Sequence, residues 1–156
     1  MITGQLAWYN RHMALKGFTS TLEMVRTGKP VTQASRGMLV EIRPHSVPWS
    51  SVARLSGKLG VAPGDLLTVI GIAERTGVRR QKEGFLKPDE ADRLLRVGRV
   101  LEEACRVFGS ENKAAKWLST SSAVFSELTP LSLLDSDAGT QAVTDELTRI
   151  DFGDFA

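Results

Sequence analysis

The sequence predicts an all-α protein, and three observations lead to this prediction. Residues 50–84 read as three short helices separated by glycine-containing corners. A longer amphipathic helix then begins at Pro88 and ends at Gly109. The rest of the chain divides into short helical segments that begin at Ser or Thr, residues that favour helix N-caps. Because helices this short are marginal alone, we expect them to pack through their apolar faces.

Residues 1–47 carry the weakest signals. We expect short helices near residues 6–15, after Ser20 and over residues 38–42. The two histidines, His12 and His45, lie far apart without other ligand residues nearby. We therefore predict no metal site.

From residue 49 the pattern is clearer. Ser50 is the expected cap of a helix over residues 51–59, and a second helix begins at Pro63. A corner at Gly71 leads into a third helical segment over residues 73–84. Two helices joined by a short turn that contains Gly are typical of a helix-turn-helix.

In a DNA-binding helix-turn-helix the second helix lies in the major groove, with its N-terminal residues at the base edges. The residues predicted to meet bases are Glu74, Arg75, Thr76, Val78 and Arg79. Those predicted to meet phosphates are Arg80 and Lys82. Gly77 is unusual inside a recognition helix, because Gly within a helix costs about 1 kcal/mol relative to Ala.

The helix that begins at Pro88 carries acidic residues in its first turn, where the helix dipole favours negative charge. Its apolar residues recur every three or four positions, so they share one face: Leu94, Val97, Leu101, Cys105 and Phe108. Its arginines Arg93, Arg96 and Arg99 lie on one side. We expect a solvated stripe there, with an interface or ion pairs to nearby carboxylates as the alternatives.

Three further segments follow. Ser110 is the expected cap of a helix that includes Trp117 and Leu118, and Thr129-Pro130 the start of a short helical turn. The turn should bury Leu131, Leu133 and Leu134. Ser136 should cap a last helix whose apolar residues are Ala138, Ala142, Val143, Leu147 and Ile150. We interpret the large apolar residues, with Phe108, as core.

Four stretches in the second half appear in a familiar order: ADRLLRVGRV (91–100), AAKWL (114–118), TPLSLLDSDAG (129–139) and AVTDELTRIDFGDFA (142–156). Together they resemble the toxin-binding domain of the Xre/MbcA/ParS antitoxins, which partner RES-domain toxins. The resemblance implies a Cro-like helix-turn-helix directly before that domain, where LLTVIGIAERTGVRRQ lies. We therefore expect a DNA-binding and dimerisation domain over residues 1–85 and a toxin-binding domain over residues 86–156.

Composition is ordinary for a globular chain, with 42% hydrophobic residues and a net charge of +2. Residues 75–99 carry 8 − 4 = +4 charges and residues 135–156 carry 1 − 6 = −5. This asymmetry suggests two partners of opposite charge preference, although solvated faces are an equal alternative. The lone Cys105 favours a reducing compartment and a buried, inert thiol. With no membrane-spanning run and no signal peptide, we expect a cytoplasmic protein.

The last residues differ from a typical polar terminus: Phe152, Gly153, Asp154, Phe155 and Ala156. Aromatic anchors and carboxylates suit a partner's pocket, although both rings could instead fold back onto the core. The resemblance implies that the partner is a RES toxin that acts on NAD⁺ and receives the antitoxin's C-terminus at its active site. The prediction is inhibition by occlusion, with operator DNA as a second partner and a homodimer as the DNA-binding form.

The sequence is compatible with one other function and argues against a second. A plain helix-turn-helix transcription regulator whose C-terminal domain only dimerises would keep the DNA site and lose the toxin. An enzyme is the second, and the sequence offers no nucleophile–base pair, phosphate loop or metal-ligand spacing for it. We therefore predict a protein that is not an enzyme and carries no cofactor.

Overall fold

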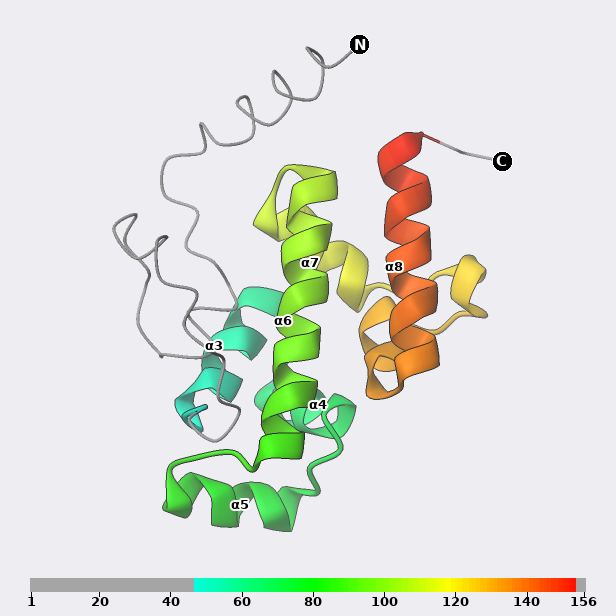
Figure 1. Cartoon of the computed structure of the whole chain (residues 1–156). Helices are drawn as coiled ribbons and strands as arrows, with labels where there is room; N and C mark the ends of the chain where they lie inside the picture. Colours follow the sequence, from blue (N-terminus) through cyan, green and yellow to red (C-terminus); the bar gives the residue numbers. More distant parts are fainter. Residues whose placement is uncertain (1–46, 154–156) are drawn as a thin grey trace.

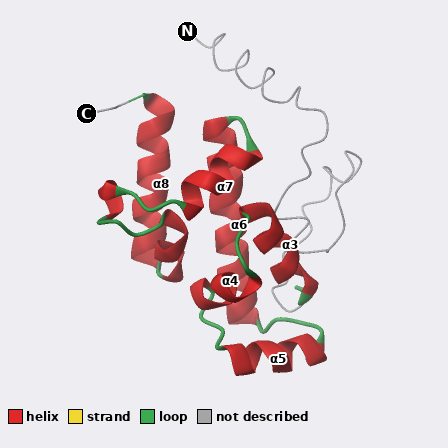
Figure 2. Cartoon of the chain, turned by 180° about the vertical axis from the view of Figure 1, so that it is seen from behind, coloured by secondary structure: helices red, strands yellow, loops and turns green. Residues whose placement is uncertain are grey.

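The computed structural model describes residues 47–153, which form helices and loops with no strand (Figure 2). The elements are α3 (Ser50–Leu59), α4 (Pro63–Val69), α5 (Glu74–Glu83), α6 (Pro88–Phe108), α7 (Glu111–Ser119), the 3-10 helices η3 (Ala123–Phe125) and η4 (Pro130–Asp135), and α8 (Asp137–Phe152). The all-α prediction is confirmed. Within the described range, no helix is both long and apolar enough to span a bilayer.

Helix α6 runs through the middle of the molecule, with α5 at one end and the C-terminus of α8 towards the other (Figure 1). Its side chains are buried on more than one side, so a single apolar core extends from Val47 to Leu147. The predicted inward residues Leu94, Val97 and Leu101 are fully buried, whereas Phe108 is half-buried. The core therefore joins the two halves of the chain without a linker.

Cys105 lies in this core, and its burial raises the pKa of the thiol to about 11. The thiol is therefore protonated at neutral pH and a poor nucleophile. This agrees with the expectation of a buried, inert cysteine.

The helix ends follow the capping residues closely. Gly109 ends α6 in the left-handed conformation, and the side chains of Ser110, Thr129 and Ser136 accept backbone N–H groups of the helices that they precede. The expected cap at Ser50 is wrong, because α3 begins at Ser50 itself and Trp49 occupies the N-cap without a side-chain bond.

The apolar face predicted for α8 is correct only in part. Val143 and Leu147 are fully buried, whereas Ala138 and Ala142 are exposed. A methyl group adds little apolar area, so these alanines do not decide which side of the helix faces the core. Gly139 lies at the tight corner between η4 and α8, where an added Cβ would sit 2.0 Å from the carbonyl oxygen of Leu133.

Helix α5 is attached to the body mainly by polar contacts. Its buried residues are Gly77 and Arg80. The Arg80 guanidinium donates from Nε to both carboxylate oxygens of Glu90, at 3.0 and 2.8 Å, and from Nη1 to Glu83 at 2.6 Å. Glu90 also accepts the backbone N–H of Lys87 at 2.8 Å, so one carboxylate fixes α5 and caps the start of α6.

The titration of Glu90 reflects these bonds. Burial opposes the charged carboxylate, but the hydrogen bonds from Arg80 and from the Lys87 N–H outweigh it and lower the pKa of Glu90. The bonds to Glu90 and Glu83 likewise raise the pKa of Arg80, so the pair is ionised at neutral pH.

We predict that Gly139→Ala destabilises the protein by about 2 kcal/mol, because the added methyl meets a backbone oxygen that moves only with the whole corner. The matched control is Gly57→Ala, in the middle of α3, where an added Cβ has nothing within 4 Å. That change should stabilise the protein by roughly 0.5–1 kcal/mol through helix propensity. Urea unfolding followed by circular dichroism measures both. Equal stabilities for the two variants would contradict the corner geometry.

We predict that Glu90→Gln lowers the melting temperature by roughly 5 °C, because it removes a charged acceptor from a nearly buried pair. Since folding lowers the pKa of Glu90, its contribution is complete above the ordinary carboxylate pKa and disappears as the pH falls below it. The difference in melting temperature between wild type and Glu90→Gln should therefore shrink on acidification from pH 7 to pH 3.

The control for this prediction is Asp89→Asn in the same helical turn. Asp89 is exposed and meets Arg93 at 3.2 Å, an exposed pair worth little. If Asp89→Asn lost as much stability as Glu90→Gln, the effect would come from the interaction of negative charge with the helix dipole and not from the contact with Arg80.

Candidate DNA-binding and partner-binding surfaces

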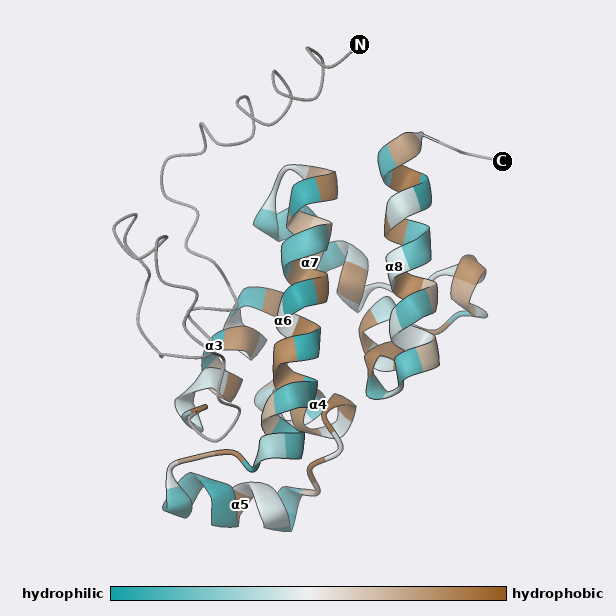
Figure 3. Cartoon of the chain, in the orientation of Figure 1, coloured by the Kyte–Doolittle hydropathy of each residue, from teal (hydrophilic) through white to brown (hydrophobic). Residues whose placement is uncertain are grey.

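Helix α5 presents a basic face to solvent. Arg75, Arg79 and Lys82 are exposed and recur at spacings of four and three, which places them on one side of the helix. Val78 lies among them, with 53% of its surface exposed. Figure 3 shows α5 as the hydrophilic helix at the end of the molecule. The face combines cations for phosphates and guanine with an apolar contact for thymine.

The other predicted contact residues differ in position. Glu74 is exposed in the first turn of α5 and Thr76 is half-buried. Arg80 corrects the sequence-based prediction, because only 3% of its surface is exposed and its guanidinium is held by Glu90 and Glu83. Arg80 is therefore a positioning residue for α5 and does not face a phosphate.

Gly77 has a packing role that the sequence did not reveal. An added Cβ would lie 3.1 Å from Cδ1 of Leu67 and 3.4 Å from the Trp49 ring. The glycine thus lets α5 approach α4 and Trp49 closely. Its cost in helix propensity is offset by this contact.

The turn between α4 and α5 is also held from α6. Arg93 donates from Nη1 to the carbonyl oxygen of Ile70 at 2.9 Å, and Arg96 pairs with Asp137 at 2.7 Å. The expected solvated stripe on α6 is therefore wrong for these two arginines, which tie α6 to the turn and to the start of α8. Arg99 is exposed.

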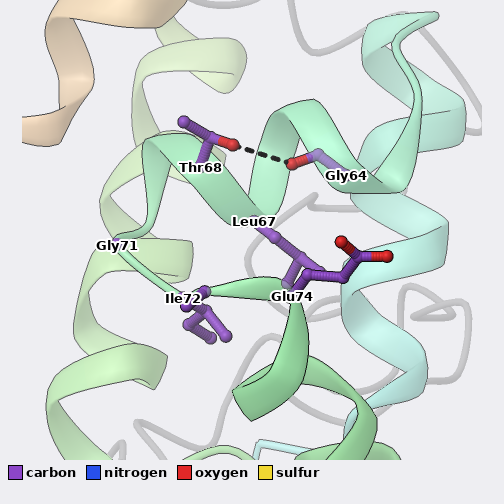
Figure 4. A pocket seen from close by; sticks show the side chains of 7 residues that line it. Gly64, Leu67, Thr68, Gly71, Ile72 and Glu74 are labelled. Atoms are coloured by element: carbon purple, nitrogen blue, oxygen red, sulfur yellow. Dashed lines mark hydrogen bonds between the residues drawn. The ribbon is translucent and has the colours of Figure 1, made fainter.

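A shallow hollow lies between α4 and the start of α5 (Figure 4). Two polar side chains reach it: Thr68, whose hydroxyl donates to the carbonyl of Gly64 at 3.1 Å, and the exposed Glu74. No nearly buried polar side chain lines it. We interpret the hollow as part of the helix-turn-helix surface.

The second surface lies where α8 ends. Phe152 is the last residue of the helix and is 82% exposed, so this ring does not fold back onto the core. Gly153 caps the helix with a positive φ of 71°, a conformation that directs the chain out of the helical path. Asp154, Phe155 and Ala156 lie outside the described residues.

An ion pair at the surface joins this end of α8 to α6. Arg106 near the end of α6 donates from Nη1 to Asp151 at 2.8 Å, one residue before Phe152. The contact joins residues 45 positions apart in the sequence. The contact therefore joins the last turn of α8 to the end of α6.

The two surfaces lie at opposite ends of α6 (Figure 1). A helix of 21 residues is about 30 Å long, which sets the approximate distance between the two surfaces.

Comparison with known proteins identifies both halves. Residues 38–99 match the family described as the antitoxin Xre-like helix-turn-helix domain. Residues 104–153 match the antitoxin Xre/MbcA/ParS C-terminal toxin-binding domain. Both matched regions include part of α6, and the division at residues 85 and 86 stays a prediction.

Three relatives carry the name antitoxin Xre. A protein of Photorhabdus laumondii is 31% identical over 111 residues, which are 70% of this chain and 75% of the relative. One of Yersinia enterocolitica is 28% identical over 128 residues, 81% of this chain and 80% of the relative. One of Pseudomonas putida is 39% identical over 72 residues, 46% of this chain and 45% of the relative. The chain therefore belongs to the Xre/MbcA/ParS-type antitoxins, with a DNA-binding helix-turn-helix followed by a toxin-binding domain.

Proposed function

We propose that this antitoxin neutralises a RES-family toxin that degrades NAD⁺, by placing residues 152–156 in the toxin's active-site cleft. The observation that carries the proposal is the exposed ring of Phe152 at the end of α8, followed by the helix-ending Gly153. A large apolar side chain left in water on a fixed helix end is suited to a partner's pocket. Burial of Val143 and Leu147 holds α8 in place beforehand, with the Arg106–Asp151 pair near its end, and this reduces the entropy lost on binding.

The tail is proposed to inhibit by occlusion. Asp154 and the carboxylate of Ala156 would occupy the positions in the cleft that bind the phosphates of NAD⁺. Phe155 would fill an adjoining pocket. Arginine forks that bind phosphates also bind carboxylates. This chain performs no chemistry in the scheme.

We further propose that the antitoxin represses its own operon as a cytoplasmic homodimer. The basic face of α5 supports DNA contact by Arg75, Arg79 and Lys82 through charge, and by Val78 through apolar contact. Two copies on a palindromic operator multiply the affinity of one helix. The separation of α5 from the end of α8 leaves room for the toxin on the same complex.

Deletion of residues 152–156 is predicted to abolish neutralisation without unfolding the protein, because Phe152 is exposed and the buried residues of α8, Val143 and Leu147, remain. Cellular NAD⁺ is measured in cells that co-express the RES toxin with either the full or the shortened antitoxin. NAD⁺ should collapse with the shortened chain. Asp145→Asn, an exposed change of one acidic residue in the middle of α8, is the matched control and should leave protection intact. Full protection by the shortened chain would remove the tail from the mechanism.

Arg79→Ala is predicted to weaken operator binding by about tenfold at an unchanged melting temperature, because its side chain is exposed and a lost base or phosphate contact costs roughly 1–3 kcal/mol. Fluorescence anisotropy with promoter DNA over a salt series measures both affinity and its salt slope. Arg106→Ala, an equal change of charge on α6, serves as the control and should leave operator affinity unchanged. An unaltered affinity for Arg79→Ala would argue against the assigned face.

A further inference from the structure

The loop between α7 and η4 holds an unusual backbone conformation. Ser126 and Glu127 are consecutive residues with positive φ angles of 54° and 64°, and neither is glycine. L-residues with a Cβ rarely occupy this region, and adjacent pairs persist only where the surrounding structure imposes them. The surrounding structure therefore holds this loop in one defined conformation.

Hydrogen bonds within the loop impose that shape. The Ser122 N–H donates to the carbonyl of Leu128 at 3.1 Å, the Glu127 N–H to that of Ser122 at 3.0 Å, and the Leu128 N–H to that of Phe125 at 3.1 Å. Phe125 anchors the loop from inside, with its ring 6.3 Å from that of Trp117 in an edge-on arrangement. We call residues 122–128 the knob.

The knob carries two apolar side chains on its outside. Val124 is 57% exposed and Leu128 is 49% exposed, although Phe125 between them is buried. The knob is the gold turn at the right edge of Figure 1, and the same turn is hydrophobic in Figure 3. Single exposed apolar residues are common, but here two share one rigid loop.

The location of these residues identifies the kind of partner. Among residues 47–153, the exposed large hydrophobic side chains are Val78, Phe85, Val124, Leu128 and Phe152. The last three lie within residues 104–153, the part that matches a toxin-binding domain. Phe152 belongs to the tail, which leaves Val124 and Leu128 as the apolar side chains offered by the remainder of that domain.

We propose that the knob is a second toxin-binding contact, which inserts Val124 and Leu128 into an apolar depression on the toxin outside its substrate cleft. The proposal rests on the proposed function, since the toxin is the partner in both. A rigid loop loses little entropy on binding, so its apolar contacts contribute to affinity almost in full. The knob supplies affinity and the tail supplies inhibition, and different elements carry the two tasks.

The test uses the full-length chain and a catalytically inactive form of a purified RES toxin whose NAD⁺ depletion the wild-type chain neutralises. The double variant Val124→Ser/Leu128→Ser should bind this toxin about 100-fold more weakly by titration calorimetry, since each buried side chain contributes roughly tenfold. At saturating concentration it should still inhibit active toxin completely, because its tail is intact.

Val78→Ser is the matched control. Val78 has nearly the same exposure as Val124 and lies on α5, so this variant should keep full toxin affinity while it weakens operator binding. The knob variant should show the reverse. Wild-type toxin affinity in the double variant would overturn the proposal.

A second variant guards against misfolding. Val124→Asp places a charge at an exposed position, and it should retain the wild-type melting temperature and lose toxin affinity by more than tenfold. If both knob variants retain affinity, the proposal fails. The chain without residues 152–156, tested beside them, separates the two ideas: it should bind and not inhibit, and inhibition by it would contradict the tail mechanism without affecting the knob measurement.

Discussion

Burial of α6 on several sides is the constraint on which the rest of the structure depends. Leu94 and Leu101 are fully covered, and the same core continues from α3 and α4 into α7 and α8. A helix covered in this way cannot shift against one group of neighbours without disturbing the other. Helix α5 and the end of α8 are consequently held at a fixed separation along one element.

The attachment of α5 follows a different principle from that of the other helices. It buries a glycine and a charged arginine instead of an apolar stripe. A buried charge pair fixes geometry more than it adds stability, because desolvation of Arg80 and Glu90 opposes their attraction. Because the opposite face of α5 does not pack against the core, it can carry basic side chains.

The toxin-binding half shows a comparable separation of tasks. Arg106 and Asp151 hold the end of α8, from which Phe152 projects into solvent. The loop at residues 122–128 projects from another part of the same domain and is kept in shape by its own hydrogen bonds and by Phe125. Both projecting parts are anchored at their bases, and anchoring of this kind reduces the entropy that a group loses when it binds a partner.

The order and ends of most helices were determined by the sequence itself. Gly109, Ser110 and Ser136 act on their neighbours within one helical turn, so local sequence carries their effect. The resemblance to a toxin-binding domain was confirmed over residues 104–153. The basic residues of α5 other than Arg80 are exposed, as a basic surface requires.

Tertiary structure decided what depends on residues distant in the chain. Arg80 looked like a phosphate contact because an arginine in a basic helix is usually solvated, and its burial depends on Glu90 one element later. From the sequence, Gly77 is only a cost in helix propensity. The tertiary structure shows that the missing side chain lets Trp49 and Leu67 pack against α5. The left-handed pair at Ser126 and Glu127 has no signature in residue type. Capping is local chemistry and can be read along the chain, whereas burial and strain are set by the neighbours that folding brings together.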